Sequence, residues 1–253
     1  MLLRLFLLLP LLLVPPLLSA EAEHDRVTLS EDIDMDLRYF SAEGDTLLLG
    51  FPCDLGLGRA EARAGEVLSQ RGIEVWMADL LGAHFLPIAP SSMRSLKGRE
   101  VARLITHVMR QTDKRIVLIA SGYGAVPALR GARLWQTEHP DNRRLDGTIL
   151  FYPMLSAHNP KPGQPLEYLD VVHHTRLPIV IMQPTNTPTR FWIDKLERTL
   201  ESGGSRVQVE LLPGVRGHFY DREDATEAER AMARRLPELV EQALKQLAQM
   251  EIP

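Results

Sequence analysis

Residues 115–129 read RIVLIASGYGAVPAL. The first six residues of this stretch form a short apolar run rich in Ile and Val, which is typical of a buried strand. Small residues follow at once in the SGYG run of residues 121–124, and they allow a tight turn with a close contact between helix and strand. Pro127 is tolerated near the start of the helix that the last residues predict. The stretch therefore predicts a strand, a sharp glycine turn and a helix.

Similar apolar runs recur along the rest of the chain. They predict strands at residues 26–30, 35–40, 46–51, 73–78, 147–154, 178–182 and 206–212. Helices are predicted at residues 60–71, 92–111 and 190–200 and from residue 221 onward, with a bend at Pro237, whereas residues 79–90 are predicted to be a loop. Strands that alternate with helices favour a mostly parallel sheet covered on both faces. We expect a single-domain α/β fold with a mostly parallel eight-stranded sheet and helices on both faces.

Composition limits the class of protein. The chain has 253 residues, of which 45% are hydrophobic and 25% charged, and this suits one soluble domain with a sizeable core. The formal net charge of -4 gives no support for a nucleic-acid partner. The single cysteine, Cys53, excludes an internal disulfide and any metal site built from several cysteines.

Residues 1–20 differ from the rest of the chain. Arg4 is their only charge, the run that follows is almost purely Leu, Phe, Val and Pro, and Ser19-Ala20 precedes a polar segment. This pattern predicts a cleaved secretory signal peptide, with residues 21–253 as the mature domain. The alternative is an uncleaved anchor, which the prolines in the apolar run disfavour. We therefore expect a periplasmic or secreted protein with no membrane span after cleavage.

The strand, turn and helix of residues 115–129 resemble the nucleophile elbow of the α/β-hydrolase family. In that family the elbow reads small-x-nucleophile-x-small, and the resemblance places Gly122 at the nucleophile position. Glycine has no side chain that could attack a carbonyl. Ser121 stands one residue earlier, and since neighbouring side chains diverge in an elbow, we expect it to point away from the nucleophile position. The alternative role for Ser121 is a small polar turn residue that bonds the following backbone.

Two further stretches carry the resemblance. Leu49-Gly50-Phe51 ends a predicted strand where the family often has a His-Gly pair, so the backbone N–H groups of Phe51 and Tyr123 are the implied oxyanion donors. Residues 211–219, LLPGVRGHF, resemble the loop of the catalytic histidine and make His218 the implied general base. The alternative for His218 is a loop histidine without a catalytic role.

The acid of the catalytic triad has no carboxylate at the position that the resemblance implies, and the nearest acids after the sixth predicted strand are Glu167 and Asp170, whose alternative is a solvated surface position. The resemblance places the acid at Thr187, or at Asn186 with a slip of one residue, and neither side chain is a carboxylate. A carboxylate fixes the imidazole tautomer and stabilises the imidazolium. Both the nucleophile position and the acid position therefore depart from the family.

Other chemistries find less support. Cys53 is a second nucleophile candidate near the implied oxyanion loop, and its alternative is a buried inert thiol. The Gly122-Tyr123-Gly124 run is weak as a dinucleotide fingerprint, because it lacks the third small residue and the later acid. The histidines show no HxH or HxxxH spacing, so we expect neither a metal nor another cofactor.

Three functions remain as hypotheses. The first is a pseudo-hydrolase that binds a small or acyl ligand, or a partner protein, at the degenerate site. The second is an active esterase, thioesterase or peptidase that uses Ser121 and His218. The third is an interaction module that binds through its surface. The missing nucleophile and acid favour the first, and the retained histidine loop favours the second. The fold alone does not choose, because it carries many functions.

Overall fold

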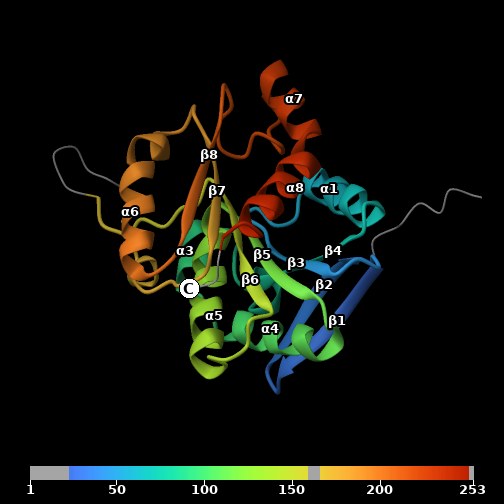
Figure 1. The fold of residues 1–253 in the computed structure, drawn as a ribbon. Helices are drawn as coiled ribbons and strands as arrows, with labels where there is room; N and C mark the ends of the chain where they lie inside the picture. The colour runs from blue at the N-terminus through green and yellow to red at the C-terminus, as the bar shows by residue number, and fades with distance from the viewer. Residues whose placement is uncertain (1–22, 159–165, 251–253) are drawn as a thin grey trace, which may run out of the picture.

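The computed structural model describes residues 23–158 and 166–250, and these form one α/β domain (Figure 1). The predicted signal peptide, residues 1–20, lies outside the described residues. One sheet of eight strands forms the centre of the described part of the chain, in the order β1-β2-β4-β3-β5-β6-β7-β8. Its strands are β1 Glu23–Ser30, β2 Ile33–Phe40, β3 Thr46–Phe51, β4 Ile73–Ala78, β5 Arg115–Ser121, β6 Leu145–Phe151, β7 Ile179–Pro184 and β8 Val207–Leu212.

The direction of the strands confirms the predicted sheet. Strand β2 pairs antiparallel with β1 and with β4, and every other neighbouring pair is parallel. Strand β5 lies between β3 and β6, with Leu118 opposite Leu49 on one side and Thr148 on the other. In parallel strands the carboxyl ends meet at one edge of the sheet, and ligand sites of open α/β folds lie there. The loops after β3, β5, β6, β7 and β8 therefore share one edge.

Helices cover both faces of the sheet, as expected (Figure 1). They are α1 Arg59–Gln70, α2 Leu80–Ala83, α3 Pro90–Ser95, α4 Arg99–Gln111, α5 Ala125–Glu138, α6 Ile193–Gly203, α7 Glu227–Arg234 and α8 Leu236–Leu247, with 3-10 turns η1 Gly122–Gly124, η2 Asp170–His173 and η3 Pro188–Trp192. Helices α1 and α8 pack together on one face. Helices α3, α4, α5 and α6 pack on the other face, over the larger apolar core.

Three predicted segments are divided differently in the structure. The predicted helix of residues 92–111 is two helices, because Gly98 adopts a positive φ of 85° between them. The predicted helix from residue 221 begins only at Glu227, and it is interrupted at Arg235 rather than bent at Pro237, which lies in the first turn of α8. The predicted loop of residues 79–90 contains the short helix α2, whose first turn is capped by the Asp79 carboxylate.

The close approach of α4 and α5 explains the glycine at position 98. A Cβ atom on Gly98 would lie 2.5 Å from the backbone nitrogen of Gly131, and a Cβ atom on Gly131 would lie 2.3 Å from the Val101 side chain. Larger side chains would force the two helices apart. The pair of glycines thus holds α5, and with it the turn at its N-terminus, against the core.

No helix in the described part of the chain is both long enough and apolar enough to cross a membrane.

Candidate active site

The turn after β5 has the sharp geometry that the sequence predicts. Strand β5 ends at Ser121, Gly122 follows with a φ of 50°, and α5 begins at Ala125. A φ in this region is costly for residues with a Cβ atom. A Cβ atom on Gly122 would lie 3.3 Å from both the Cys53 Cβ and the Tyr152 ring. The position from which a family nucleophile would project is therefore bordered by these two side chains.

Ser121 points to the other face of the sheet. It lies on the same side of β5 as Val117 and Ile119, whereas Gly122 would project to the opposite side. The serine is 4% exposed, and its Oγ donates a hydrogen bond of 3.4 Å to Glu61 Oε1 rather than to the turn backbone. No direct hydrogen bond joins Ser121 to His218 among the described residues. The pairing of these two residues as nucleophile and base stays a prediction.

His218 lies beside Cys53 and Tyr152. Its Nδ1 is 3.6 Å from Cys53 Sγ and 3.4 Å from the Tyr152 hydroxyl. Cys53 comes from the loop after β3, Tyr152 directly follows β6, and His218 lies in the loop after β8. The shared edge of the sheet thus brings together three side chains that are far apart in the sequence.

Backbone strain is concentrated at this cluster. Among the described residues, three that are not glycine have a positive φ, and two of them are Tyr152 (39°) and His218 (56°). Such conformations persist where the surrounding structure enforces them, and they are frequent at functional sites. The strain supports a functional role for the cluster.

Burial sets the protonation of the two reactive side chains. Cys53 is 4% exposed, and burial raises the pKa of its thiol to about 12, so the sulfur holds its proton at neutral pH. Burial also lowers the pKa of His218, which keeps the imidazole neutral and able to accept a proton. The resting pair is therefore a thiol and a neutral imidazole.

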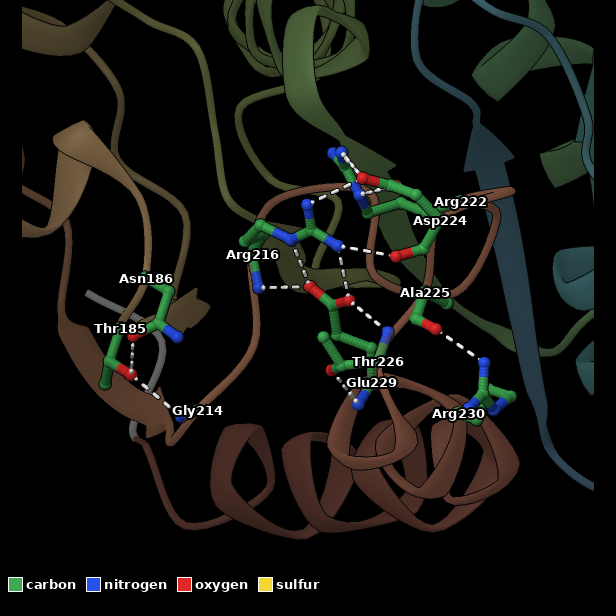
Figure 2. A network of polar contacts seen from close by, with 10 residues as sticks. All are labelled: Thr185, Asn186, Gly214, Arg216, Arg222, Asp224, Ala225, Thr226, Glu229 and Arg230. Carbon is green, nitrogen blue, oxygen red and sulfur yellow. Dashed lines mark hydrogen bonds and ion pairs between the residues drawn. The ribbon is translucent and has the colours of Figure 1, made fainter.

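An ion-pair network anchors the loop that carries His218 (Figure 2). The Arg216 guanidinium binds both carboxylate oxygens of Glu229 at 2.7 Å, and it also binds Asp224 at 2.9 Å. Glu229 is 1% exposed, and it closes the N-terminus of α7 by accepting from the Thr226 backbone. Hydrogen bonds to Arg216 hold the pKa of Glu229 well below its usual range. The loop is thus fixed two residues before His218.

The acid position lies beside the histidine loop but supplies no negative charge. The Thr187 methyl group would be 3.6 Å from a Cβ atom on Gly217, so this position does face the loop. The Thr187 hydroxyl is bonded to the Pro184 carbonyl and to Gln183. The Asn186 backbone donates to the Val215 carbonyl, and its side chain accepts from Thr185 (Figure 2). Neither side chain has a hydrogen bond to His218.

The implied oxyanion donors lie at adjacent strand ends. Phe51 is the last residue of β3 and is paired in register with Ala120 of β5, and Tyr123 follows Gly122 in the turn. A Cβ atom on Gly50 would lie 2.0 Å from the sulfur of the flexible Met77 side chain and 3.3 Å from the Trp76 carbonyl oxygen. The role of the two N–H groups in holding an oxyanion stays a prediction.

Glu61 is a site residue for which we had no prediction. It lies in the first turn of α1 and is half-buried as a residue, and burial of its carboxyl group raises the pKa of that group to about 7. Its carboxylate accepts from the Gly58 backbone at 3.0 Å and from the Tyr220 hydroxyl at 3.2 Å. The Gly58-x-x-Glu61 spacing, a helix-start pattern, was the only local signal for it. Tyr152 and Tyr220 were also missed, because Tyr152 is 66 residues from His218 and Tyr220, two residues after His218, belongs to no recognised motif.

Three side chains of the site could hold a metal ion. Ligand atoms of Cys53, Asp54 and His218 lie within 4.8 Å of one another. Thiolate, carboxylate and imidazole suit Zn²⁺, which needs three protein ligands at a catalytic site. Histidine spacing alone did not reveal this set, because its members come from two loops. The same Cys53 and His218 atoms serve as nucleophile and base if no ion is bound.

Comparison with known structures identifies the fold. Thermogutta terrifontis esterase 2 is 17% identical, with 90% of this chain and 96% of that chain covered and a TM-score of 0.63. A putative dienelactone hydrolase from Klebsiella pneumoniae is 12% identical, with 90% and 99% covered and a TM-score of 0.63. The Fe-lacking apo form of EstFA is 11% identical, with 88% and 84% covered and a TM-score of 0.64. The chain therefore has the α/β-hydrolase fold, as the elbow resemblance implied.

Comparison with protein-family models found no match. Comparison with curated protein sequences found no match either.

Proposed function

We propose that the chain is an esterase-type hydrolase in which Cys53 is the nucleophile and His218 the general base. The observation that carries the proposal is the 3.6 Å contact between Cys53 Sγ and His218 Nδ1 beside Gly122. The thiol borders the space from which a nucleophile at the elbow would project. A nucleophile within reach of a histidine base is the arrangement that acyl transfer requires. The esterase structures with the same fold support this class of reaction.

The reaction follows from the protonation states. Cys53 sulfur attacks the ester carbonyl carbon while His218 Nδ1 takes the thiol proton, and the backbone N–H groups of Phe51 and Tyr123 receive the oxyanion. The C–O bond then breaks, and the alcohol leaves with the proton from the imidazolium. Water, activated by the same imidazole, hydrolyses the thioester and releases the carboxylic acid. Because the Cys53 thiol is protonated at rest, His218 must remove its proton before the sulfur can attack. We therefore expect His218 to be essential at every pH where Cys53 is neutral.

The presence of a small apolar cavity favours an ester with a short acyl chain as the substrate. The cavity has a volume of about 120 Å³ and is lined in part by residues 153–155, which directly follow Tyr152 in the sequence. Its walls include Tyr168, Trp192 and Leu196. We propose that it takes the acyl part of a small ester. We also propose that residues 1–20 direct the protein to the periplasm or the exterior, where a small ester substrate would be met.

The first test is acylation of the purified protein by p-nitrophenyl butyrate, followed by mass spectrometry of its peptides. We expect a butyryl group on the peptide that contains Cys53. We also expect Cys53→Ala and His218→Ala to lower kcat/KM at least about a hundredfold, since each removes a group that acts in the chemical step. Ser121→Ala is the matched control, and it should retain most of the activity.

Two outcomes would contradict this mechanism. Turnover that survives Cys53→Ala and is lost in Ser121→Ala would instead support the hydrolase hypothesis built on Ser121. The absence of both acylation and turnover would support a second candidate, a pseudo-hydrolase that binds a small or acyl ligand or a partner protein. The specific observations that favour this candidate are the glycine at the nucleophile position and the high pKa of the buried thiol.

A further inference from the structure

A buried carboxyl group lies at the end of a row of hydroxyl groups that leads to the candidate base. The Tyr220 hydroxyl donates to Glu61 Oε1 at 3.2 Å and lies 2.5 Å from the Tyr152 hydroxyl. The Tyr152 hydroxyl in turn lies 3.4 Å from His218 Nδ1. Both tyrosines are buried, so water does not interrupt the row from the side of these rings. A continuous hydrogen-bonded path thus links Glu61 to His218.

The usual source of negative charge for the histidine is missing in this site. Positions 186 and 187 hold an amide and a hydroxyl, and neither reaches His218. A histidine that accepts a proton in a buried site needs a partner that stabilises the resulting imidazolium. The Glu61 carboxyl group is buried without an arginine or lysine among its hydrogen-bond partners in the described part of the chain. Since burying a carboxyl without a cation is unfavourable, a functional reason for it is needed.

We propose that Glu61 is the carboxylate that the triad lacks, and that it acts on His218 through the hydroxyl groups of Tyr220 and Tyr152. Glu61 is then a positioning residue, because it does not touch the reacting atoms. The inference rests on the proposed function for its catalytic consequence, but the link between Glu61 and His218 can be measured without turnover.

The direction of the hydrogen bonds depends on the charge of Glu61. An ionised Glu61 accepts from Tyr220, whose oxygen accepts from Tyr152, and the Tyr152 oxygen is then free to accept from a protonated His218 Nδ1. A protonated Glu61 permits the reverse order, in which Tyr152 donates to the Nδ1 lone pair. In that order the Tyr152 hydrogen bond occupies the lone pair of His218 Nδ1, which is the atom that must take the Cys53 proton. Ionised Glu61 therefore favours the imidazolium, and neutral Glu61 opposes its formation.

The change in the charge of Glu61 is expected near neutral pH. Burial raises the pKa of Glu61 to about 7, whereas the Gly58 backbone, Tyr220 and Ser121 lower it by donating to the carboxylate. Asp221 adds a negative charge that also raises it. The other titratable groups around the path are Cys53, Tyr152 and His218, with Asp54, Asp221 and Arg222 facing the histidine. We expect kcat/KM to rise with pH through about 7 as Glu61 ionises.

The test is a titration of His218 by nuclear magnetic resonance in protein that is labelled with ¹⁵N-histidine and freed of metal ions with a chelator, at pH values from 5 to about 9. Glu61→Gln and Tyr220→Phe each break the path with a side chain of similar shape. We expect both variants to lower the pKa of His218 by about half a pH unit or more, and to change the ¹⁵N shift of Nδ1. Tyr39→Phe is the control, because it removes a tyrosine hydroxyl from a ring that packs against Trp76, away from the path.

Kinetics supply the second readout. We expect Glu61→Gln to lower kcat/KM about tenfold and to remove the rise near pH 7, a smaller loss than the roughly 10⁴-fold cost of removing a directly bonded triad carboxylate. An unchanged His218 titration in both folded variants would overturn the inference. If the titration shifts in a protein that turns over no ester, the link between Glu61 and His218 stands and the proposed function fails.

Discussion

Gly122 shows how one residue can keep the shape of an active site while removing its usual chemistry. Its φ of 50° preserves the sharp turn, and its missing side chain leaves space for Cys53 and Tyr152. The contact between Cys53 and His218 depends on that space. We interpret the glycine as part of a rearranged site in which the reactive side chain comes from the neighbouring loop.

Replacing Gly122 by serine tests this interpretation. We expect Gly122→Ser to destabilise the protein by more than the about 1–2 kcal/mol that a left-handed backbone costs a residue with a Cβ atom, because the new atom meets Cys53 and Tyr152. The control is Gly72→Ser, since Gly72 has a φ of 85° and nothing within 4 Å of its Cβ position. Urea unfolding measures both. Equal losses in the two variants would show that Cys53 and Tyr152 do not fill the nucleophile position.

At the scale of elements, the loop between β8 and α7 determines where His218 lies. The apolar run of β8 brings the chain to the edge of the sheet, and Arg216 then ties the loop to the first turn of α7 through Glu229 (Figure 2). Because one carboxylate serves both the arginine and the helix cap, the loop and the helix are expected to lose order together.

Glu229→Gln tests this coupling. We expect the variant to lower the midpoint of thermal unfolding by roughly 3–8 °C at pH 7 and to weaken His218-dependent activity. The folded pKa of Glu229 lies below its ordinary value of 4.5, so its stabilisation is present above pH 4.5 and is lost as the pH falls through the folded pKa. The difference between wild type and variant should therefore shrink in acid.

The exposed Glu227, which pairs with Arg230 on the same helix, provides the control for Glu229. We expect Glu227→Gln to change the midpoint by much less, because exposed ion pairs contribute little. Circular dichroism melts at pH 7 and pH 3 would separate the two positions. A loss of the same size at both positions would contradict a special role for Glu229.

For the whole molecule, the buried carboxyl of Glu61 makes the free energy of unfolding depend on pH in the opposite sense to Glu229. Its pKa of about 7 in the folded protein lies above the ordinary value of 4.5, so the folded state binds more protons between these pH values. Stability from this residue is therefore full below pH 4.5 and declines as the pH rises through about 7. A difference of about 2.5 pH units corresponds to roughly 3 kcal/mol.

Glu61→Gln isolates this contribution. We expect the stability of wild type relative to the variant to fall by roughly 3 kcal/mol between pH 4 and pH 8, because the glutamine does not ionise. Urea unfolding at several pH values measures the difference. A constant difference across this range would mean that Glu61 has the same pKa in the folded and the unfolded protein, which would also remove the basis for a rise of activity near pH 7.

Local sequence was sufficient for most of the fold. Apolar runs of six or seven residues, such as residues 46–51 and 115–121, form strands wherever both faces are covered, so β3 and β5 were predictable from hydrophobicity. The division of residues 92–111 into α3 and α4 was not predicted. It depends on the contact of Gly98 with Gly131, which lies on another helix. Element boundaries that are set by tertiary contacts leave no periodic signal in the sequence.

Residue patterns were enough to predict the α/β architecture, the glycine turn after β5 and the absence of a nucleophile and an acid at the expected positions. Which side chains meet at the site depends on the tertiary structure. Cys53 and His218 are 165 residues apart, and Glu61 and Tyr220 are 159 apart. The physical reason is that parallel strands gather loops from distant parts of the chain at one edge of the sheet. Contacts of this kind depend on the order of the strands, which no local pattern of residues contains.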